Sequence, residues 1–296
     1  GVLVLDDLLS AEELRACRAE GQRLLELGEM VSAGQESVGR TDKHLFGDEQ
    51  DFRARGCGEL AGAVGLLKSV AACLNQRTTM AGPGVRSHLP AEPAKVGDGG
   101  APPRPAQLVP LTPEHERAML ATYDGGGARY DVHRDARPSS GSIETDVEAF
   151  RASPHTSNAR HLTLVFYLNE PSWEAEGGGV LRCHLCPPRW LGDVDIRISA
   201  PEHPDVCPPD CPGRSGTCHL DVLPRGGRLV VFFSRELYHE VQPSWHKRWA
   251  LTLWVADARF PRKTAKDILN WKRAMDENFV KQLLGQSAGA QQGGTA

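Results

Sequence analysis

Short runs of apolar and β-branched residues dominate the second half of the chain. Gly, Pro, Asn and Asp bound these runs, as is typical of strands joined by turns. In the run 162–168, alternation places Thr163, Val165 and Tyr167 on one face and leucine or phenylalanine on the other. Strands that follow one another without intervening helices favour an antiparallel sandwich or jelly roll. The predicted strands are 2–5, 119–123, 162–168, 179–185, 228–233 and 248–255.

Helical spacing of apolar residues predicts helices on either side of this β region. Ser10 with Glu13 is a capping-box pattern and predicts a helix start. The following helix would bury Leu14, Cys17, Leu24 and Leu25, a second would bury Leu60, Val64, Leu67, Val70 and Leu74, and a third is predicted over 264–284. The expected fold is therefore mainly β, with a jelly-roll core packed by N-terminal and C-terminal helices.

Composition divides the rest of the chain into loops and inserts around one domain, 1–284. The polar segment 31–51 is predicted to be a mobile loop over a site. The segment 82–113 is rich in Pro and Gly and predicts a flexible insert. Residues 285–296 are small and polar and predict a disordered tail.

Charge and hydropathy exclude two classes of partner. The 296 residues are 40% hydrophobic and 24% charged, with a formal net charge of -4 and no basic face of the kind that binds nucleic acid. No stretch approaches the roughly 18 apolar residues of a membrane-spanning helix. There is no N-glycosylation acceptor, which favours the cytoplasm or nucleus. We expect a monomer that binds neither nucleic acid nor membrane.

A His-x-Asp triplet is the first sign of chemistry. On an extended segment His133 and Asp135 project from the same face and could grip one metal ion. The same triplet recurs at His203 and at His219, so the pattern alone is weak. Only His133 follows a glycine-rich loop and precedes the most strand-like part of the chain.

A third ligand and a cation follow later in the sequence. His239 comes after the strand that ends at Phe233, and two histidines with one carboxylate are the ligand set of non-haem Fe(II) oxygen chemistry. Arg248 lies nine residues after His239, on a strand that returns across a turn at 242–244. Its guanidinium could hold a carboxylate by a bidentate contact in the same cavity.

These motifs, in this order, resemble the oxygen-sensing (hypoxia-inducible-factor type) prolyl 4-hydroxylases of the Fe(II)/2-oxoglutarate-dependent dioxygenase superfamily. The resemblance runs from residue 1 to about residue 260. The collagen-type branch is less similar, because it generally carries a lysine where this chain has Arg248. The motifs are Tyr123, Tyr130, His133-x-Asp135, 160–169, Trp173 with 177–182, and 239–243 through 248–254.

The resemblance implies a role for each matching residue. His133, Asp135 and His239 would bind Fe(II), and Arg248 would pair with the distal carboxylate of 2-oxoglutarate. Tyr167 would donate to that carboxylate and Tyr123 would bind near the iron. Further cofactor-contacting positions would be Thr163, Leu181 and Trp254, and substrate-contacting positions Arg160, Arg40, Asp42 and Tyr130. The resemblance also implies a double-stranded β-helix, the jelly roll that the strands favour.

The function implied is prolyl 4-hydroxylation. A prolyl residue of a protein or peptide would be oxidised with O2 and 2-oxoglutarate to hydroxyproline, succinate and CO2, with ascorbate keeping the iron reduced. The residues beyond the metal and cosubstrate ligands include no separate catalytic group. Two alternatives stay open: the same chemistry on another residue or a small molecule, and a catalytically silent jelly-roll binding module.

Each site residue also has an ordinary structural interpretation. His133 and His239 could be hydrogen-bonded histidines of a sandwich, and Arg248 could be half of a structural ion pair. Tyr167 and Trp254 could be core aromatics. Arg40 with Asp42 could be a solvated loop pair, and Arg160 an ordinary surface cation.

Crowded cysteines mark an insert at 183–219, and a second insert spans 137–158; neither has a counterpart in the family core. Paired ligands close in sequence are how small zinc sites form. Disulfides and free thiols are the alternatives. The candidate ligands of a structural Zn(II) are Cys183, Cys186, Cys207, Cys211, Cys218 and His219.

Overall fold

The computed structural model describes residues 1–34, 40–79, 117–136, 143–152, 159–185, 219–257 and 260. The predicted helix 264–284, the tail 285–296, the insert 82–113 and Cys186, Cys207, Cys211 and Cys218 lie outside these residues. Within them no helix is long and apolar enough to cross a membrane.

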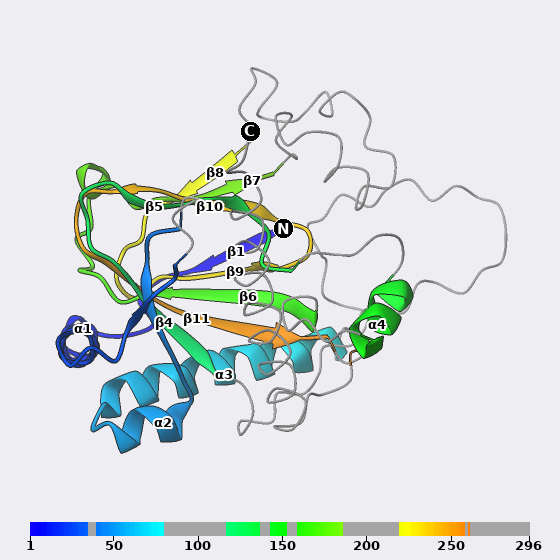
Figure 1. Ribbon diagram of the computed structural model, residues 1–296, viewed down its shortest axis with the longest axis horizontal. Helices are drawn as coiled ribbons and strands as arrows, with labels where there is room; N and C mark the ends of the chain where they lie inside the picture. Colours follow the sequence, from blue (N-terminus) through cyan, green and yellow to red (C-terminus); the bar gives the residue numbers. More distant parts are fainter. Residues whose placement is uncertain are drawn as a thin grey trace, which may run out of the picture.

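Two antiparallel sheets face each other, and the space between them holds the site (Figure 1). The larger sheet has the order β1-β9-β6-β11-β4-β3-β2 and the smaller has the order β5-β10-β7-β8. This is the jelly-roll core that the sequence predicts. The strands are β1 (Val2–Leu5), β2 (Val31–Ser32), β3 (Lys43–Gly47), β4 (Ala118–Tyr123), β5 (Ala128–His133), β6 (Arg160–Tyr167), β7 (Leu181–His184), β8 (His219–Val222), β9 (Leu229–Phe233), β10 (Tyr238–Ser244) and β11 (Arg248–Ala256).

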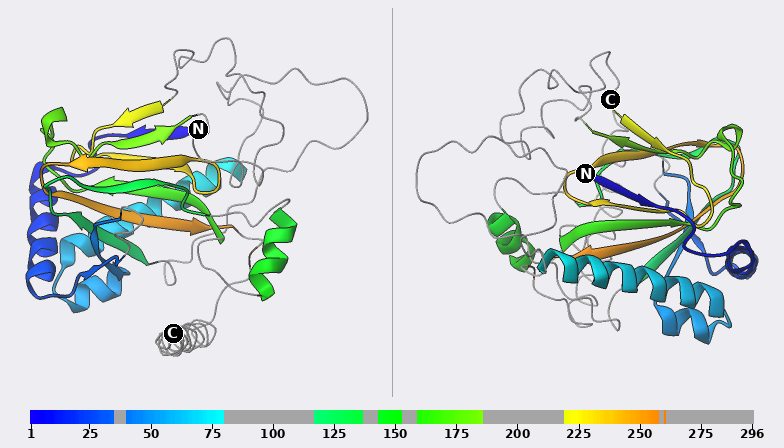
Figure 2. Two further views of the ribbon diagram at one scale, coloured as in Figure 1. Left: turned by 45° about the horizontal axis from the view of Figure 1, so that its top comes forward. Right: turned by 180° about the vertical axis from the view of Figure 1, so that it is seen from behind.

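Helices cover the outer face of the larger sheet (Figure 2). The first, α1 (Ala11–Glu26), begins at Ser10, whose side chain and that of Glu13 form the predicted capping box. The others are α2 (Glu49–Ala54) and α3 (Gly58–Thr79) on the same face, α4 (Ile143–Ala152) beyond the ends of β6 and β11, and the short 3-10 turn η3 (Ala175–Gly177).

Alternation along the strands of the larger sheet separates two cores. In β11, Trp249, Leu251 and Leu253 pack against the helices, in a cluster with Leu14 of α1 and Phe52 of α2. The alternate residues of these strands face the smaller sheet, where Tyr167 and Ala250 join a second cluster between the sheets. Strand β6 has its predicted faces, and its inward face is the one that reaches the site.

The described residues of the segment 31–51 include strands and the start of a helix, where the polar composition predicts a mobile loop. The segment contributes β2, β3 and the start of α2, and β3 pairs along its whole length with β4. This pairing with a strand far along the chain overrides the weak strand propensity of the sequence around Lys43 and Gly47. His44 and Phe46 of β3 therefore line the inner cavity.

Candidate metal centre

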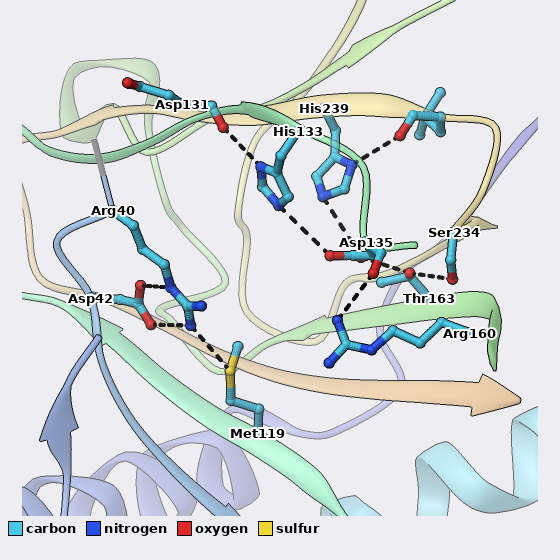
Figure 3. Close-up of polar contacts among 11 residues, drawn as sticks. Arg40, Asp42, Met119, Asp131, His133, Asp135, Arg160, Thr163, Ser234 and His239 are labelled. Atoms are coloured by element: carbon cyan, nitrogen blue, oxygen red, sulfur yellow. Dashed lines mark hydrogen bonds and ion pairs between the residues drawn. The ribbon is translucent and has the colours of Figure 1, made fainter. Parts of the chain in front are cut away.

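Three potential metal ligands meet between the two sheets. His133 ends β5, Asp135 follows two residues later, and His239 lies opposite His133 in the pairing of β10 with β5. Their ligand atoms all lie within 4.8 Å of one another. Asp135 places Oδ1 3.7 Å from His133 Nε2 and Oδ2 3.8 Å from His239 Nε2 (Figure 3). The three ligands predicted from the sequence therefore come together: His133 from the end of β5, Asp135 from the residues that follow β5, and His239 from β10.

Backbone carbonyls fix which nitrogen of each imidazole faces this point. His133 Nδ1 lies 2.8 Å from the carbonyl oxygen of Asp131, and His239 Nδ1 lies 3.2 Å from that of Leu237. Because a carbonyl only accepts, both Nδ1 atoms carry the proton and donate. The Nε2 lone pairs are then free for a metal ion, with the ring orientations set by the second nitrogen.

The carboxylate of Asp135 is held from behind. Thr163 Oγ1 donates to Asp135 Oδ2 at 2.7 Å and lies 2.8 Å from Ser234 Oγ. Arg160 Nη1 donates to the backbone oxygen of Asp135 at 3.2 Å. Thr163 is fully buried and does not line the cavity as the resemblance implies; its contact is with the ligand.

Electrostatics favour the protonation states that bind a divalent cation. Burial opposes ionisation of Asp135, but His239, His133 and Arg160 outweigh it and hold its pKa well below the ordinary value. Burial, together with the charge of His133, lowers the pKa of His239 to about 4. A charged carboxylate and a neutral imidazole are the required ligand forms. Two nitrogens and one oxygen on one side of the ion suit non-haem iron.

The other His-x-Asp triplet within the described residues has a different setting. On β8, His219 Nε2 lies 3.6 Å from Asp221 Oδ2, and both are partly exposed. Arg182 already holds Asp221 through two hydrogen bonds of 2.8 Å. In the part of the chain that the structure describes, no third ligand completes a group around His219.

A cavity of about 130 Å³ opens beside the ligands, roughly ten times the space that one water molecule needs. The inward parity of β11 supplies one wall, from Arg248 through Ala250 and Thr252 to Trp254. The predicted cofactor-contacting positions Tyr123 and Leu181 also line it, and the Tyr167 ring lies beside the lining residue Arg248.

Arg248 is a buried cation that pairs with no carboxylate among the described residues. It is 2% exposed, and its guanidinium carbon lies 5.0 Å from the ring centres of both Tyr123 and Tyr167. Within the described residues no carboxylate forms a salt bridge with it, and its Nε lacks a hydrogen bond of normal geometry. A structural ion pair is thereby contradicted for this part of the chain. A cation left unpaired in the interior is costly unless a ligand supplies the negative charge.

The two tyrosines beside Arg248 are suited to donate to such a ligand. Burial raises the pKa of Tyr167 to about 12 and raises that of Tyr123 as well. Both phenols therefore keep their protons at neutral pH. Within the described residues the buried hydroxyl of Tyr167 has no hydrogen bond of normal geometry, so it too is suited to donate to a bound ligand.

A glycine makes the approach of Arg248 possible. Gly179 has φ +66°, and a Cβ at this position would lie 2.8 Å from Cδ of Arg248. Only glycine combines this backbone conformation with so close a neighbour. Gly179 belongs to the 177–182 motif, and its contact explains why the side chain of Arg248 can cross it.

Aromatic and cationic side chains surround the metal ligands on the open side. Tyr130 stacks on His133 with ring centres 3.7 Å apart, and the guanidinium carbon of Arg40 lies 5.1 Å from the Tyr130 ring. Arg160 lies over the ring of Trp254 at 3.8 Å. Arg40, Arg160, Tyr130 and Trp254 all line the cavity, as their predicted roles require.

Arg40 and Asp42 form a buried ion pair and not a solvated one. Arg40 Nε donates to Asp42 Oδ1 at 2.6 Å and Nη2 to Oδ2 at 3.1 Å, while Asp42 is 0% exposed (Figure 3). Burial alone would raise the pKa of Asp42, but His44 and Arg40 outweigh it and lower the pKa to about 2.

Asp42 should make the unfolding free energy of the metal-free protein fall at acidic pH. A carboxyl group with a depressed folded-state pKa stabilises the fold above its unfolded pKa, and this contribution is lost as the pH falls through the folded value. We expect the difference in unfolding free energy between wild type and Asp42→Asn to shrink by about 2 kcal/mol between roughly pH 5 and pH 2. Urea unfolding across that range measures it, and a constant difference would contradict the assignment.

Sequence reasoning missed several residues of the site. Ala250 and Thr252 lie between two predicted positions of β11, so the two-residue period of a strand could have found them. His44 and Phe46 face the cavity from β3 with the same period. Ser234 and the two carbonyls that bind the histidines carry no sequence signal.

Of the cysteines that are candidate zinc ligands, only Cys183 lies within the described residues. Cys183 is a free thiol, fully buried in the cluster between the sheets, and burial raises its pKa to about 12. Among the described residues, no group of three or more potential metal ligands includes Cys183. His219 lies on the sheet edge at β8. The other four candidates lie outside the described residues, and zinc binding by them stays a prediction.

Comparison with known proteins finds a family whose model matches the part of the chain that carries this site. Residues 118–256, which contain the three ligands and Arg248, match the 2OG-Fe(II) oxygenase superfamily. The prolyl hydroxylase EGLN3 of Mus musculus is 30% identical over 170 residues, which cover 57% of this chain and 52% of that protein. The chain thus spans about half the length of this relative.

Two solved structures share the fold. A prolyl-4-hydroxylase of Pseudomonas putida superimposes with a TM-score of 0.51 and 23% identity, over 86% of this chain and 92% of the other. A prolyl hydroxylase of Trichoplax adhaerens, solved with a hypoxia inducible factor peptide fragment, gives 0.50 and 18%, over 87% and 84%. At these identities the likeness concerns the fold.

Proposed function

We propose that this chain, whose residues 118–256 match the 2OG-Fe(II) oxygenase superfamily, is an Fe(II)- and 2-oxoglutarate-dependent dioxygenase that hydroxylates a prolyl residue of a protein or peptide. One observation carries the proposal. The buried guanidinium of Arg248, which has no carboxylate partner among the described residues, shares a single cavity with two histidines and a carboxylate whose ligand atoms converge. Ascorbate as the reductant of the iron belongs to the same proposal.

Each side chain has a definite task in this chemistry. His133, His239 and Asp135 hold the metal, and Arg248 binds the distal carboxylate of 2-oxoglutarate with Tyr167 as a second donor. Bound iron, 2-oxoglutarate and O2 supply the oxidising power, with succinate and CO2 as the co-products. The apolar walls at Leu181 and Val165 exclude water from the cavity.

Arginines and aromatic rings at the opening suit a peptide. Arg40, fixed by Asp42, and Arg160, stacked on Trp254, present planar donors that can bind backbone carbonyl oxygens. Tyr130, stacked on His133, offers an apolar face next to the metal ligands. The similarity to EGLN3, a prolyl hydroxylase by name, favours proline as the residue that these groups orient.

A peptide library tests the substrate. The protein, loaded with Fe(II) and supplied with 2-oxoglutarate under air, should add one oxygen atom to proline-containing peptides, with succinate formed in equal amount. The matched control library carries alanine at each proline and should remain unmodified. Fragmentation mass spectrometry locates the oxygen. If only residues other than proline were oxidised, the oxygenase activity would be confirmed and the prolyl substrate rejected. If no 2-oxoglutarate were consumed at all, a catalytically silent binding module would be favoured.

A further inference from the structure

We propose that helix α4 positions the metal ligands, through an ion pair between its Asp146 and Arg235 of the β9–β10 loop, residues 234–237. This inference rests on the metal centre of the proposed function. Helix α4 is the described part of the insert 137–158, which follows the ligand Asp135 directly in sequence. A helix that follows Asp135 in the sequence would thus help to hold the metal centre to which Asp135 belongs.

The β9–β10 loop touches the segment that carries Asp135. Ser234 Oγ lies 2.8 Å from Thr163 Oγ1, which in turn donates to Asp135 (Figure 3). The backbone oxygen of Ser234 accepts from the N–H of Ala136 at 3.0 Å. Side chain and backbone of one loop residue therefore bracket the ligand Asp135.

The same loop also orients His239 and contacts the residue between the other two ligands. The carbonyl oxygen of Leu237 accepts from His239 Nδ1, and that of Arg235 accepts from Nη1 of Arg134 at 3.3 Å. Arg134 stands between His133 and Asp135 in the sequence. A displacement of residues 234–237 would therefore be transmitted to both ligand-bearing segments, although none of these four residues binds the metal.

Arg235 ties this loop to α4. Its Nη2 pairs with Oδ2 of Asp146, which is 0% exposed, and its guanidinium carbon lies 5.9 Å from the ring centre of Phe260. Val147 of α4 packs with Ala159 and Phe260 in a small cluster of its own. The ion pair thus joins a packed helix to the loop. Because the guanidinium group is planar, it binds the carboxylate of Asp146 in a defined orientation.

Metal affinity distinguishes positioning from simple stability. Changes to residues that orient metal ligands weaken metal binding by about 10- to 100-fold. Asp146→Asn and Arg235→Met should each weaken Mn(II) binding by about tenfold, the lower end of that range, because both act through the loop. Mn(II) alone is the probe, and electron paramagnetic resonance reads its free fraction without any turnover.

A matched control has its ion pair elsewhere. Lys68 and Glu49 form a largely buried pair between α3 and α2, on the helical side of the larger sheet. Lys68→Met should lower the melting temperature and leave Mn(II) affinity unchanged. The double variant Arg235→Met with Asp146→Leu removes both charges of the pair, and it should still bind Mn(II) as weakly as the single variants.

Three results would overturn the inference: unchanged affinity in the single variants, wild-type affinity in the double variant, or equal weakening by Lys68→Met. Failure of the metal centre itself is recognised separately. In that case the wild-type protein would not bind Mn(II), or His239→Ala would bind it equally well.

Discussion

Replacing His239 with alanine should lower kcat/KM for 2-oxoglutarate turnover by more than about 100-fold, beyond the usual cost of an outer-shell change. His239 offers one of the two nitrogens of the centre, and in the described residues no other His, Cys, Asp or Glu stands ready to replace it. Succinate formation under air and metal content after dialysis measure the loss together.

His184→Ala is the matched control for this variant. His184 lies on the same sheet, opposite Tyr238 in the pairing of β7 with β10, and its Nε2 contacts Glu240 at 3.1 Å. It belongs to the opposite face of the sheet from His239. Turnover should survive this change. Equal loss in both variants would mean that His239 acts through the fold, and undiminished turnover in His239→Ala would remove it from the centre.

Replacing Arg248 with methionine should raise the KM for 2-oxoglutarate by two to four orders of magnitude. Leaving a buried carboxylate without its cation costs about 3–5 kcal/mol. The free protein should respond in the opposite way. Arg248 is buried and pairs with no carboxylate in the part of the chain that the structure describes, so methionine removes an uncompensated charge and should not lower the melting temperature.

Arg248→Lys separates charge from geometry. Lysine keeps the positive charge but lacks the planar fork that binds a carboxylate through two donors. We expect a KM between those of wild type and Arg248→Met, measured by initial rates over a range of 2-oxoglutarate concentrations. A KM that is unchanged in both variants would remove Arg248 from the cosubstrate site.

Local signals sufficed for much of the fold. The capping box at Ser10 marks the start of α1, and the alternation in β6 gives the correct inner and outer faces. Strand β3 was missed because its pairing with β4 decides its structure. Strand β10 contains Pro243, which lacks an N–H and lies where the pairing with β5 is irregular. The turn predicted at 242–244 lies inside that strand, which continues to Ser244.

The candidate site was predictable where residue type and order carry it. His133 and Asp135 share a short triplet, and His239 and Arg248 follow in strands that the resemblance places together. The supporting contacts were not predictable in this way. Ser234 and the carbonyl of Leu237 act through positions that only the closed fold defines. The burial of Arg40 with Asp42 likewise depends on β3.

One measurement tests the central claim, that the ligands and Arg248 together bind 2-oxoglutarate to iron. The Fe(II)-loaded protein is titrated with 2-oxoglutarate in the absence of oxygen, and the visible charge-transfer absorption of the chelate is followed. The account predicts a saturable band, lost in His239→Ala and shifted to much higher 2-oxoglutarate concentration in Arg248→Met. A protein that binds Fe(II) without ever developing the band, or that titrates identically after Arg248→Met, would contradict it.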